Sequence, residues 1–351
     1  MSELRNMVEE SVVKLFDDTV DREFLMEAEE KGFSSDLWAT VIELGIDRVL
    51  ASEANAGMGG TWSDAYPVVR ACGLYGVPLP IPEAIVSTWL QEQAGLSIRD
   101  GIPGLLPIAL PESADPTSLT VEIPQVPWGR QADFFVGLQA TDKGSDLVII
   151  DSSETSVSEE QNLSRDPRDI VSFNNAKIAV RGPTGLAPDA VRWLAALMRS
   201  AQIAGAGSAC LKLGLDYTSE REQFGRPLAR FQAIQHHLAN MSGELATVEA
   251  MSATAFGALE KYGLAFNAER DAKFDIAAAK CRASDAVEPL TKIGHQVHGA
   301  IGFTFEYGLH FLTRRLWSWR AEFGGSSEWA RYLGQVAVDA GGDGIWSVMT
   351  K

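Results

Sequence analysis

The N-terminal third of the chain carries a helical pattern of hydrophobic positions. Apolar side chains recur at spacings of three and four residues from position 3 to about position 96, as in Leu37, Val41 and Leu44. This spacing places them on one face of a helix, so the pattern predicts a helical region. The glycine-rich segment 56–61 is predicted to be a turn that interrupts it.

The middle of the chain has a different pattern. Between about 103 and 181 the apolar residues come in short runs rich in β-branched and aromatic side chains, which favour the strands of a small sheet or barrel. The predicted strands are 119–123, 134–138, 147–150 and 178–180. The polar and charged stretch 151–168 is expected to be an exposed loop.

Helical spacing returns beyond Gly182 and Pro183 and indicates a helical bundle. The predicted helices are 189–220, 228–261, 267–297 and 327–340. Within the first of them, the segment 204–209 contains only Gly, Ala and Ser. Such small side chains let a neighbouring helix approach closely, although each glycine costs helix stability. We interpret this run as a site of tight packing.

Together these patterns predict a mainly α protein with a small β domain. The expected organisation is an N-terminal helical domain over 1–104, a middle β domain over 105–182 and a C-terminal helical bundle over 183–351. With 351 residues, of which 46% are hydrophobic, the chain can bury a large core.

The charge balance restricts the partners. The chain has 47 acidic and 30 basic residues and a net charge of −17, which would repel the phosphates of nucleic acids and anionic lipids. Neither nucleic acid nor a membrane surface is therefore expected as a partner. An anionic ligand such as a CoA thioester would need a local cluster of basic residues.

Cysteine usage and the N-terminus indicate the compartment. Cys72, Cys210 and Cys281 lie far apart without a CxxC pair, which is typical of a reducing compartment and argues against a disulfide framework or a zinc cage. The N-terminus has no apolar run behind a basic start, and no stretch approaches the roughly 20 apolar residues of a membrane span. A cytoplasmic protein is the expectation.

A family resemblance rests on three segments. Residues 219–232 read SEREQFGRPLARFQ and closely resemble the signature of the acyl-CoA dehydrogenase family. The segments 37–45 and 57–60 resemble the family's N-terminal domain, and 296–303, QVHGAIGF, resembles its second flavin-binding stretch. Three segments in the family's order argue against a chance match. The resemblance implies a C-terminal four-helix bundle and FAD as the cofactor.

The first motif has residues suited to a dinucleotide. A guanidinium at Arg221 offers paired donors to a pyrophosphate, Phe224 can lie against an adenine, and Gln223 can bond a polar edge. Gln232 would supply a further polar contact. In the family these residues reach across a dimer interface to the FAD of the neighbouring subunit, so the resemblance implies an oligomer. The competing interpretation pairs Arg221 with an adjacent glutamate and buries Phe224 in the core.

The second motif requires close approach of backbone to cofactor, which glycine permits because it has no Cβ. Gln296 and Gly299 are assigned to this contact, with Gly302 nearby. The family usually has two adjacent glycines here, whereas this chain has Ala300 after the first. His298 could bond a phosphate, or it could cap carbonyl groups or lie at the surface.

The carboxylate base expected of a complete enzyme is missing. Acyl-CoA dehydrogenation needs a base on one face of the acyl chain and flavin on the other. The family usually places it in a Glu-Gly-Thr segment after the last bundle helix, where this chain has Phe323 or, with a shift of one, Gly324. Members that carry the base on an earlier helix would have it within 192–199, which contains no carboxylate. Glu322 is the one nearby candidate, but an exposed loop glutamate is more often a solvated charge.

Contacts to the flavin ring are also missing from the β region. The family carries a Thr-Glu-Pro segment, then Gly-Ser-Asp and a Trp-Ile-Thr or similar, whereas residues 109–115 here read ALPESAD. Trp128 lies near the last of these, but it could equally be a packing residue. The middle domain is therefore predicted to be shortened and to hold no flavin ring of its own.

This asymmetry resembles the heteromeric α2β2 acyl-CoA dehydrogenases of steroid degradation, in which one of two related chains supplies the base. The leading hypothesis is that this chain completes the FAD site of a homologous catalytic subunit, which binds most of a bulky, possibly steroid-derived, CoA thioester. One alternative is a self-sufficient homo-oligomer that uses Glu322 or another carboxylate as its base. The other is a scaffold that binds no flavin.

Overall fold

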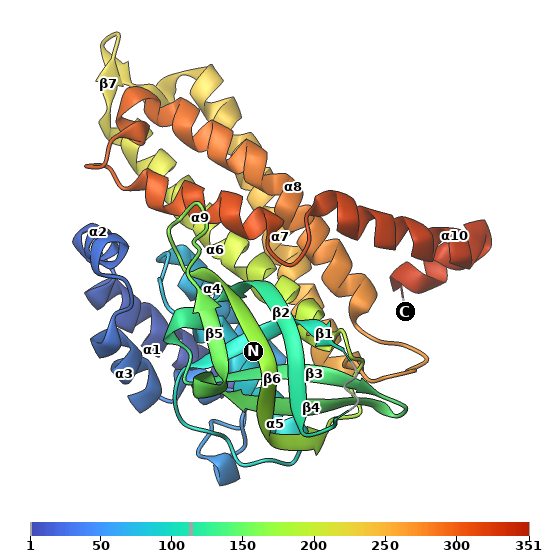
Figure 1. Ribbon diagram of the computed structural model, residues 1–351. Coiled ribbons are helices and arrows are strands. Elements are labelled where there is room, and N and C mark those ends of the chain that lie inside the picture. The colour runs from blue at the N-terminus through green and yellow to red at the C-terminus, as the bar shows by residue number, and fades with distance from the viewer. Residues whose placement is uncertain (1, 112–114, 351) are drawn as a thin grey trace.

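The computed structural model describes residues 2–111 and 115–350 (Figure 1). Helices make up its N-terminal region, as the pattern predicts. Their bounds are α1 Glu3–Thr19, α2 Arg22–Lys31, α3 Ser35–Glu43, α4 Trp62–Leu74 and α5 Ile81–Gln93, with short 3-10 turns η1 Ile46–Arg48 and η2 Glu53–Asn55. The Ser34 hydroxyl accepts the Leu37 backbone N–H and starts α3.

A sheet follows in the sequence and lies below the long helices in Figure 1. Its strands are β1 Pro103–Leu110, β2 Ser118–Pro127, β3 Phe134–Thr141, β4 Gly144–Asp151, β5 Thr155–Ser158 and β6 Arg168–Pro183, with turns η3 Gly129–Gln131 and η4 Ser152–Glu154. In the described residues the order is β1-β3-β4-β6-β2, with β5 on β6. Among the strands of this sheet within the described residues, β1 and β3 form the one parallel pair. The four predicted strands are confirmed, and β1 and β5 are additional.

The segment 151–168 is not the exposed loop that its polarity predicts. It contains β5, and Ser164 and Asp166 near its end are buried. The Asp166 carboxylate accepts hydrogen bonds from the Ser164 hydroxyl at 3.2 Å and from Arg315 at 3.1 Å. Because buried polar groups can be satisfied by such partners, a polar sequence alone did not distinguish this segment from a solvated loop.

Long helices form the C-terminal bundle. They are α6 Ala190–Glu220, α7 Gln232–Tyr262, α8 Lys273–His298, α9 Leu309–Ala321 and α10 Ser326–Thr350, which bends at Gly341. Between them lie the β7–β8 hairpin, Glu222–Gln223 with Arg226–Pro227, and the turns η5 Leu228–Arg230 and η6 Gly299–Phe303. The predicted helices are confirmed, whereas α9 was not predicted. The mainly α fold with a small β region is confirmed.

Glycines allow α4 and α6 to cross closely. A Cβ at Gly205 would lie 1.9 Å from the Arg70 carbonyl oxygen, and one at Gly73 would lie 2.0 Å from that of Gln202. Side chains at these positions would overlap with backbone, which explains the small-residue run in α6.

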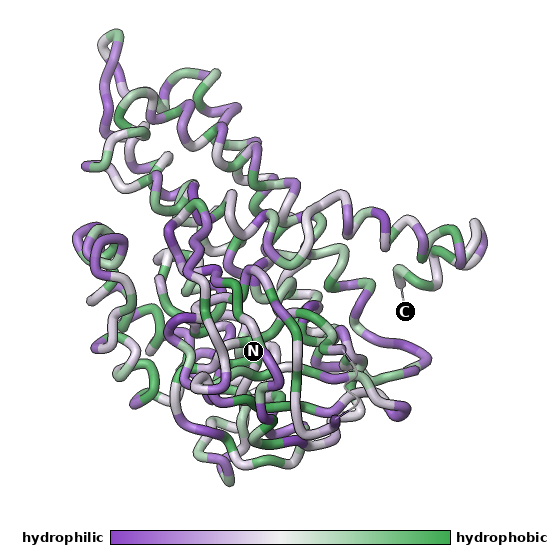
Figure 2. The backbone as a smooth tube through the Cα atoms, viewed as in Figure 1, coloured by the Kyte–Doolittle hydropathy of each residue, from purple (hydrophilic) through white to green (hydrophobic). Residues whose placement is uncertain are grey.

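The core runs along the contacts between these layers. In Figure 2 hydrophobic and hydrophilic positions alternate along the bundle helices, as expected for helices with one buried face. All three cysteines are free thiols. None of the helices within 2–111 and 115–350 combines the length and the hydropathy needed to cross a bilayer.

Candidate functional site

A groove of about 590 Å³ brings the two flavin-motif segments together at one end of the bundle. The end of α6, the β7–β8 hairpin, the start of α7 and the end of α8 contribute to it. Its lining residues are Tyr217, Arg221, Gln223, Leu228, Ile234, Gln296, Val297, His298, Gly299, Ala300 and Ile301. Four of the six predicted cofactor residues therefore share one groove, which we call the dinucleotide groove. Phe224 and Gln232 do not line it.

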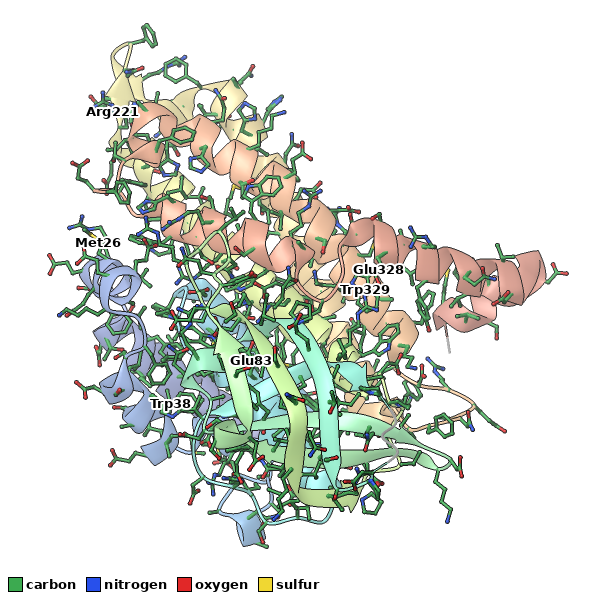
Figure 3. The ribbon with its side chains drawn as sticks, viewed as in Figure 1. Met26, Trp38, Glu83, Arg221, Glu328 and Trp329 are labelled. Atoms are coloured by element: carbon green, nitrogen blue, oxygen red, sulfur yellow. The ribbon has the colours of Figure 1, made fainter. Side chains whose placement is uncertain are left out.

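Arg221 lies where α6 ends and the hairpin begins (Figure 3). Its carbonyl oxygen accepts the Leu228 N–H at 2.9 Å, which closes the turn and fixes the position of the residue. Within the described residues no carboxylate lies at ion-pair distance from its exposed guanidinium. The pairing of Arg221 with an adjacent glutamate is thus not formed, and its donors are free to bind an anion.

Phe224 occupies the tip of the hairpin. Its backbone is left-handed, with φ 53°, and its side chain is 91% exposed. A non-glycine residue in this conformation, carrying an exposed aromatic ring, is unusual. The interpretation of Phe224 as a core residue is wrong. Gln232, the first residue of α7, is also exposed.

The end of α8 forms the other side of the groove. Gly299 terminates the helix with φ 64°, a conformation that favours glycine, and no atom lies within 4 Å of where its Cβ would stand. Its backbone is therefore open to the groove. Ala300 is not among the residues with positive φ, so this position does not require the second glycine of the family.

His298 is a buried part of the helix end. Its Nδ1 donates to the Gly294 carbonyl oxygen at 2.6 Å, its Nε2 lies 3.0 Å from the Tyr307 hydroxyl, and its ring stacks on Tyr217 at 4.9 Å. Burial lowers the pKa of the imidazole, which favours its neutral form. Both ring nitrogens thus have partners within the chain, and the carbonyl-capping interpretation fits this geometry.

Tyr217 is a groove residue that the sequence reasoning missed. It lies on α6, four residues before Arg221, which caps the end of that helix, and both residues line the groove. Helical spacing counted back from Arg221 would have found it.

The chemistry of the groove fits a dinucleotide. A free guanidinium can bind a pyrophosphate, the amides of Gln223 and Gln296 can bond polar edges, and the bare backbone at Gly299 allows close approach. Phe224 stands beside them as an exposed aromatic ring whose edge-to-face contact is with Phe231, at 6.2 Å between ring centroids. Arg221 is the one arginine or lysine among the residues that line the groove in the described part of the chain, so the cluster of basic residues expected for an anionic ligand is not formed there by this chain alone.

The two segments in which the family carries its base, 192–199 and 322–324 in this chain, lie in contact in the fold, and Arg199 contacts Glu322 and Phe323 there. Glu322 follows α9, and its carboxylate contacts Arg168 at 2.8 and 3.1 Å and Arg199 of α6 at 2.7 Å. The Asn162 side chain donates a further hydrogen bond at 2.9 Å. Glu322 is thus a buried ion-pair partner, so its interpretation as a solvated loop charge is wrong.

Arg199 links Glu322 to a second buried carboxylate, Glu83. Arg199 also donates to Glu83 of α5 at 2.6 Å, and its guanidinium lies 5.1 Å from the ring centre of Phe323. We call Glu83, Arg168, Arg199 and Glu322 the arginine cluster. It joins α5, β6, α6 and the segment after α9, and Figure 3 shows Glu83 between the helices and the sheet.

This environment makes Glu322 a poor proton acceptor. Burial by itself would raise the pKa of its carboxyl, but the charges of Arg168 and Arg199 and the hydrogen bonds outweigh burial and lower the pKa to about 2. Phe323, at the family's base position, cannot take a proton.

Trp128 packs in the interior, where its ring meets that of Phe33 at 6.0 Å. The segment 109–115, which stands where the family has Thr-Glu-Pro, includes Glu112, Ser113 and Ala114, and these lie outside the described residues.

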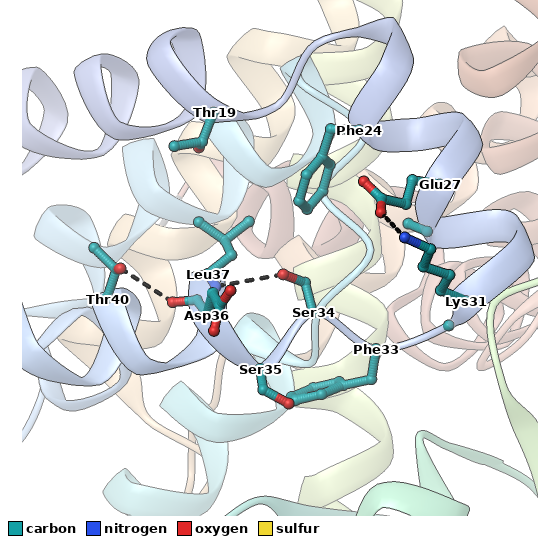
Figure 4. A pocket seen from close by; sticks show the side chains of 12 residues that line it. Thr19, Phe24, Glu27, Lys31, Phe33, Ser34, Ser35, Asp36, Leu37 and Thr40 are labelled. Atoms are coloured by element: carbon teal, nitrogen blue, oxygen red, sulfur yellow. Dashed lines mark hydrogen bonds and ion pairs between the residues drawn. The ribbon is translucent and has the colours of Figure 1, made fainter.

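A pocket of about 550 Å³ opens among α1, α2 and α3 (Figure 4). Phe24 and Leu37 face it, and the ion pair between Glu27 and Lys31 lies at its side. It contains no residue of the flavin motifs or of the arginine cluster, so it is separate from the candidate site.

Comparisons with known proteins support the family. The family model described as "Acyl-CoA dehydrogenase, C-terminal domain" matches residues 194–335. Acyl-CoA dehydrogenase IpdE2 of Mycolicibacterium smegmatis is 26% identical over 321 residues, covering 90% of this chain and 93% of IpdE2.

Solved structures show the same fold. The ChsE4-ChsE5 complex of Mycobacterium tuberculosis matches with a TM-score of 0.85 at 21% identity, covering 95% of this chain and 97% of that chain. The Tcur3481-Tcur3483 steroid ACAD matches with a TM-score of 0.82 at 21% identity, covering 95% and 98%. The fold is that of the acyl-CoA dehydrogenases. The chain belongs to the acyl-CoA dehydrogenase family.

Proposed function

We propose that this chain is a subunit of an FAD-dependent acyl-CoA dehydrogenase and that it completes the FAD site of a homologous catalytic subunit. The observation that most directly supports this proposal is the difference between the dinucleotide groove and the positions of the catalytic base. The dinucleotide groove is open, with the donors of Arg221 free, whereas the positions of the base hold Phe323 and an arginine cluster.

Each groove residue has a role in this proposal. Arg221 binds the pyrophosphate, Gln223 and Gln296 bond polar edges, and Phe224 and Gln232 extend the contact from the hairpin and the start of α7. Gly299 leaves room for the nucleotide. FAD held by these residues would supply the hydride acceptor for the β carbon of the thioester. The proton of the α carbon goes to a carboxylate of the catalytic subunit, because Glu322 is neutralised by two arginines.

The named relatives support a partner and a substrate class. The ChsE4-ChsE5 and Tcur3481-Tcur3483 structures each contain two different chains by name, and the second is called a steroid ACAD. We infer that the substrate is a bulky, steroid-derived CoA thioester and that the catalytic subunit binds most of it. The support for this substrate class is the analogy with the structure called a steroid ACAD.

The test is the flavin content of the purified chain, alone and co-expressed with a homologue that retains a Glu-Gly-Thr segment. Flavin that appears only on co-expression supports the proposal. Yellow and active protein from this chain alone supports the self-sufficient enzyme, and no flavin in either preparation supports the scaffold. In an active complex, Arg221→Ala should weaken FAD binding roughly tenfold or more, since a charge-assisted hydrogen bond contributes about 1.5–3 kcal/mol. Arg331→Ala, an exposed arginine on α10, is the control.

A further inference from the structure

A cleft of about 460 Å³ lies between the end of α2, the turn η3 and the segment 161–167, with Arg315 of α9 in its wall. We call it the polar cleft, because charged and polar side chains line most of it. It contains no residue of the flavin motifs or of the arginine cluster. Its volume is within the range of about 300–1,000 Å³ that is usual for small-molecule sites.

Several charged groups of the polar cleft already have partners. Ion pairs within the chain neutralise Glu29, Lys31, Arg130 and Asp166. Arg130, for instance, donates to the Asp169 carboxylate at 3.0 Å and to the Glu159 carboxylate at 2.8 Å. These groups form walls whose charges are balanced, so a ligand must be recognised by the groups that remain free.

Two arginines keep donors for an anion. The side chain of Arg165 forms no hydrogen bond within the described residues, and its ion-pair contact with Glu29 is long, at 3.6 Å. Arg315 is 1% exposed and donates through its terminal nitrogens, whereas its Nε has no partner in the same part of the chain. A buried donor without a partner costs free energy, so a carboxylate that accepts from it would bind favourably.

The turn that carries Arg165 is fixed before any ligand binds. The backbone of Arg165 is left-handed, with φ 65°. The side-chain oxygen of Asn162 accepts the backbone N–H groups of Ser164 at 2.9 Å and Asp166 at 3.1 Å. The Asn162 amide also donates to Glu322 at 2.9 Å, which anchors the turn to the arginine cluster. Such a preorganised turn lowers the entropy cost of binding.

The polar cleft also has free acceptors. The Oε1 atom of Gln131 is buried and has no hydrogen-bond partner within residues 2–111 and 115–350. The carboxylate of Glu30 is exposed, and no cation of these residues lies at ion-pair distance from it. A carboxylate and an amide oxygen are groups that accept hydrogen bonds from an ammonium group.

We propose that the polar cleft binds a small zwitterion of the amino-acid class. Its carboxylate accepts from Arg165 and Arg315, and its ammonium group donates to Glu30 and Gln131. A ligand with both charges satisfies both sets of free groups, whereas an anion alone would leave the acceptors unpaired beside the charge of Glu30.

The test compares a zwitterion with its two halves. Isothermal titration calorimetry of the full chain with glycine, acetate and methylammonium measures binding, because acetate and methylammonium each carry one charged end of glycine, and L-serine is titrated as a larger zwitterion. We expect both amino acids to bind and to raise the temperature of thermal unfolding, and each half to bind at least about tenfold more weakly.

Variants assign the binding to the polar cleft. Arg165→Ala and Glu30→Gln should each weaken amino-acid binding about tenfold or more, since each removes a charged partner. Arg22→Ala, an exposed residue of α2 outside the cleft, should leave binding unchanged. Arg165 and Glu30 are exposed, so both variants should fold, and thermal unfolding without ligand checks this.

Three results would overturn the proposal. They are no binding of glycine or L-serine, acetate binding as tight as that of glycine, and amino-acid binding that is the same in Arg165→Ala as in Arg22→Ala. The flavin content that tests the proposed function is a separate measurement, since the polar cleft shares no residue with the dinucleotide groove.

Discussion

At the residue scale, Glu322 shows why a carboxylate near the expected position need not be a base. Its oxygens receive hydrogen bonds from Arg168, Arg199 and Asn162, so its charged form is fully satisfied. A base must gain free energy from taking a proton. Protonation of Glu322 would instead remove the counter-charge of the buried Arg168 and one of the two carboxylate partners of Arg199.

Glu322→Gln should therefore affect stability rather than chemistry. Breaking a buried ion pair from one side costs about 3–5 kcal/mol, because it leaves an uncompensated buried charge. Glu328→Gln, which breaks an exposed pair with Arg192, should cost less than about 1 kcal/mol. Urea unfolding measures both, and turnover per folded FAD-bound complex should remain close to wild type. Retained stability with lost turnover would instead identify Glu322 as the base.

A second buried carboxyl predicts a pH dependence. Asp47 is 5% exposed, and within the described residues its Oδ1 has no hydrogen-bond partner. Burial raises the pKa of its carboxyl from 3.8 to about 6. The folded state therefore holds a proton that the unfolded state releases near pH 4, so this group's contribution to stability falls as the pH rises from about 4 to about 6 and is constant above that.

Asp47→Asn removes this penalty. The variant should be more stable than wild type at pH 7.5 by roughly 1–3 kcal/mol, and the difference should shrink towards pH 4.5. Urea unfolding at pH 7.5, 5.5 and 4.5 measures it, with Asp285→Asn, an exposed residue of α8, as the control. A difference that does not change with pH would show that Asp47 carries its charge as easily in the folded state as in the unfolded one.

At the scale of elements, the sequence predicted the long helices and the central strands because their hydrophobic periods are regular. It did not predict α9, since this helix buries Arg315 and Thr313 together with its apolar residues and so lacks a clear polar face. It also did not identify the buried part of 151–168, whose polar side chains are satisfied by partners distant in sequence.

One part of the candidate site could be predicted from the sequence, and another part could not. Motif residues identified Arg221, Gln223, Gln296 and Gly299, which share one groove. The arginine cluster was not predictable, because its members come from four elements and only the fold brings them together.

The crossing of α4 and α6 yields a prediction with a matched control. Gly205→Ala would place a Cβ 1.9 Å from a backbone oxygen, so the helices must separate. By analogy with overpacked cores, we expect this to cost at least about 1–3 kcal/mol of stability. Gly257→Ala, in α7, has nothing within 4 Å and should stabilise the protein by about 0.5–1 kcal/mol through helix propensity. Thermal unfolding of both variants tests it, and similar effects for the two would contradict the close crossing.

At the scale of the whole molecule, the chain keeps the family fold while its two functional regions differ. The arginine cluster ties the N-terminal helices, the sheet and the bundle together where a catalytic centre would need space. The opposite features, free donors and exposed aromatic rings, gather at the hairpin end of the bundle (Figure 3). This division of features is what the proposed function requires of a chain that binds the catalytic subunit at the hairpin end and supplies no base of its own.

The most direct test is the ratio of FAD to protein, measured by absorbance in the purified chain and in its complex with a homologue that retains the carboxylate base. The account predicts no bound flavin in the chain alone and FAD, with dehydrogenase turnover, in the complex. Stoichiometric flavin and turnover in a preparation that contains only copies of this chain would contradict it.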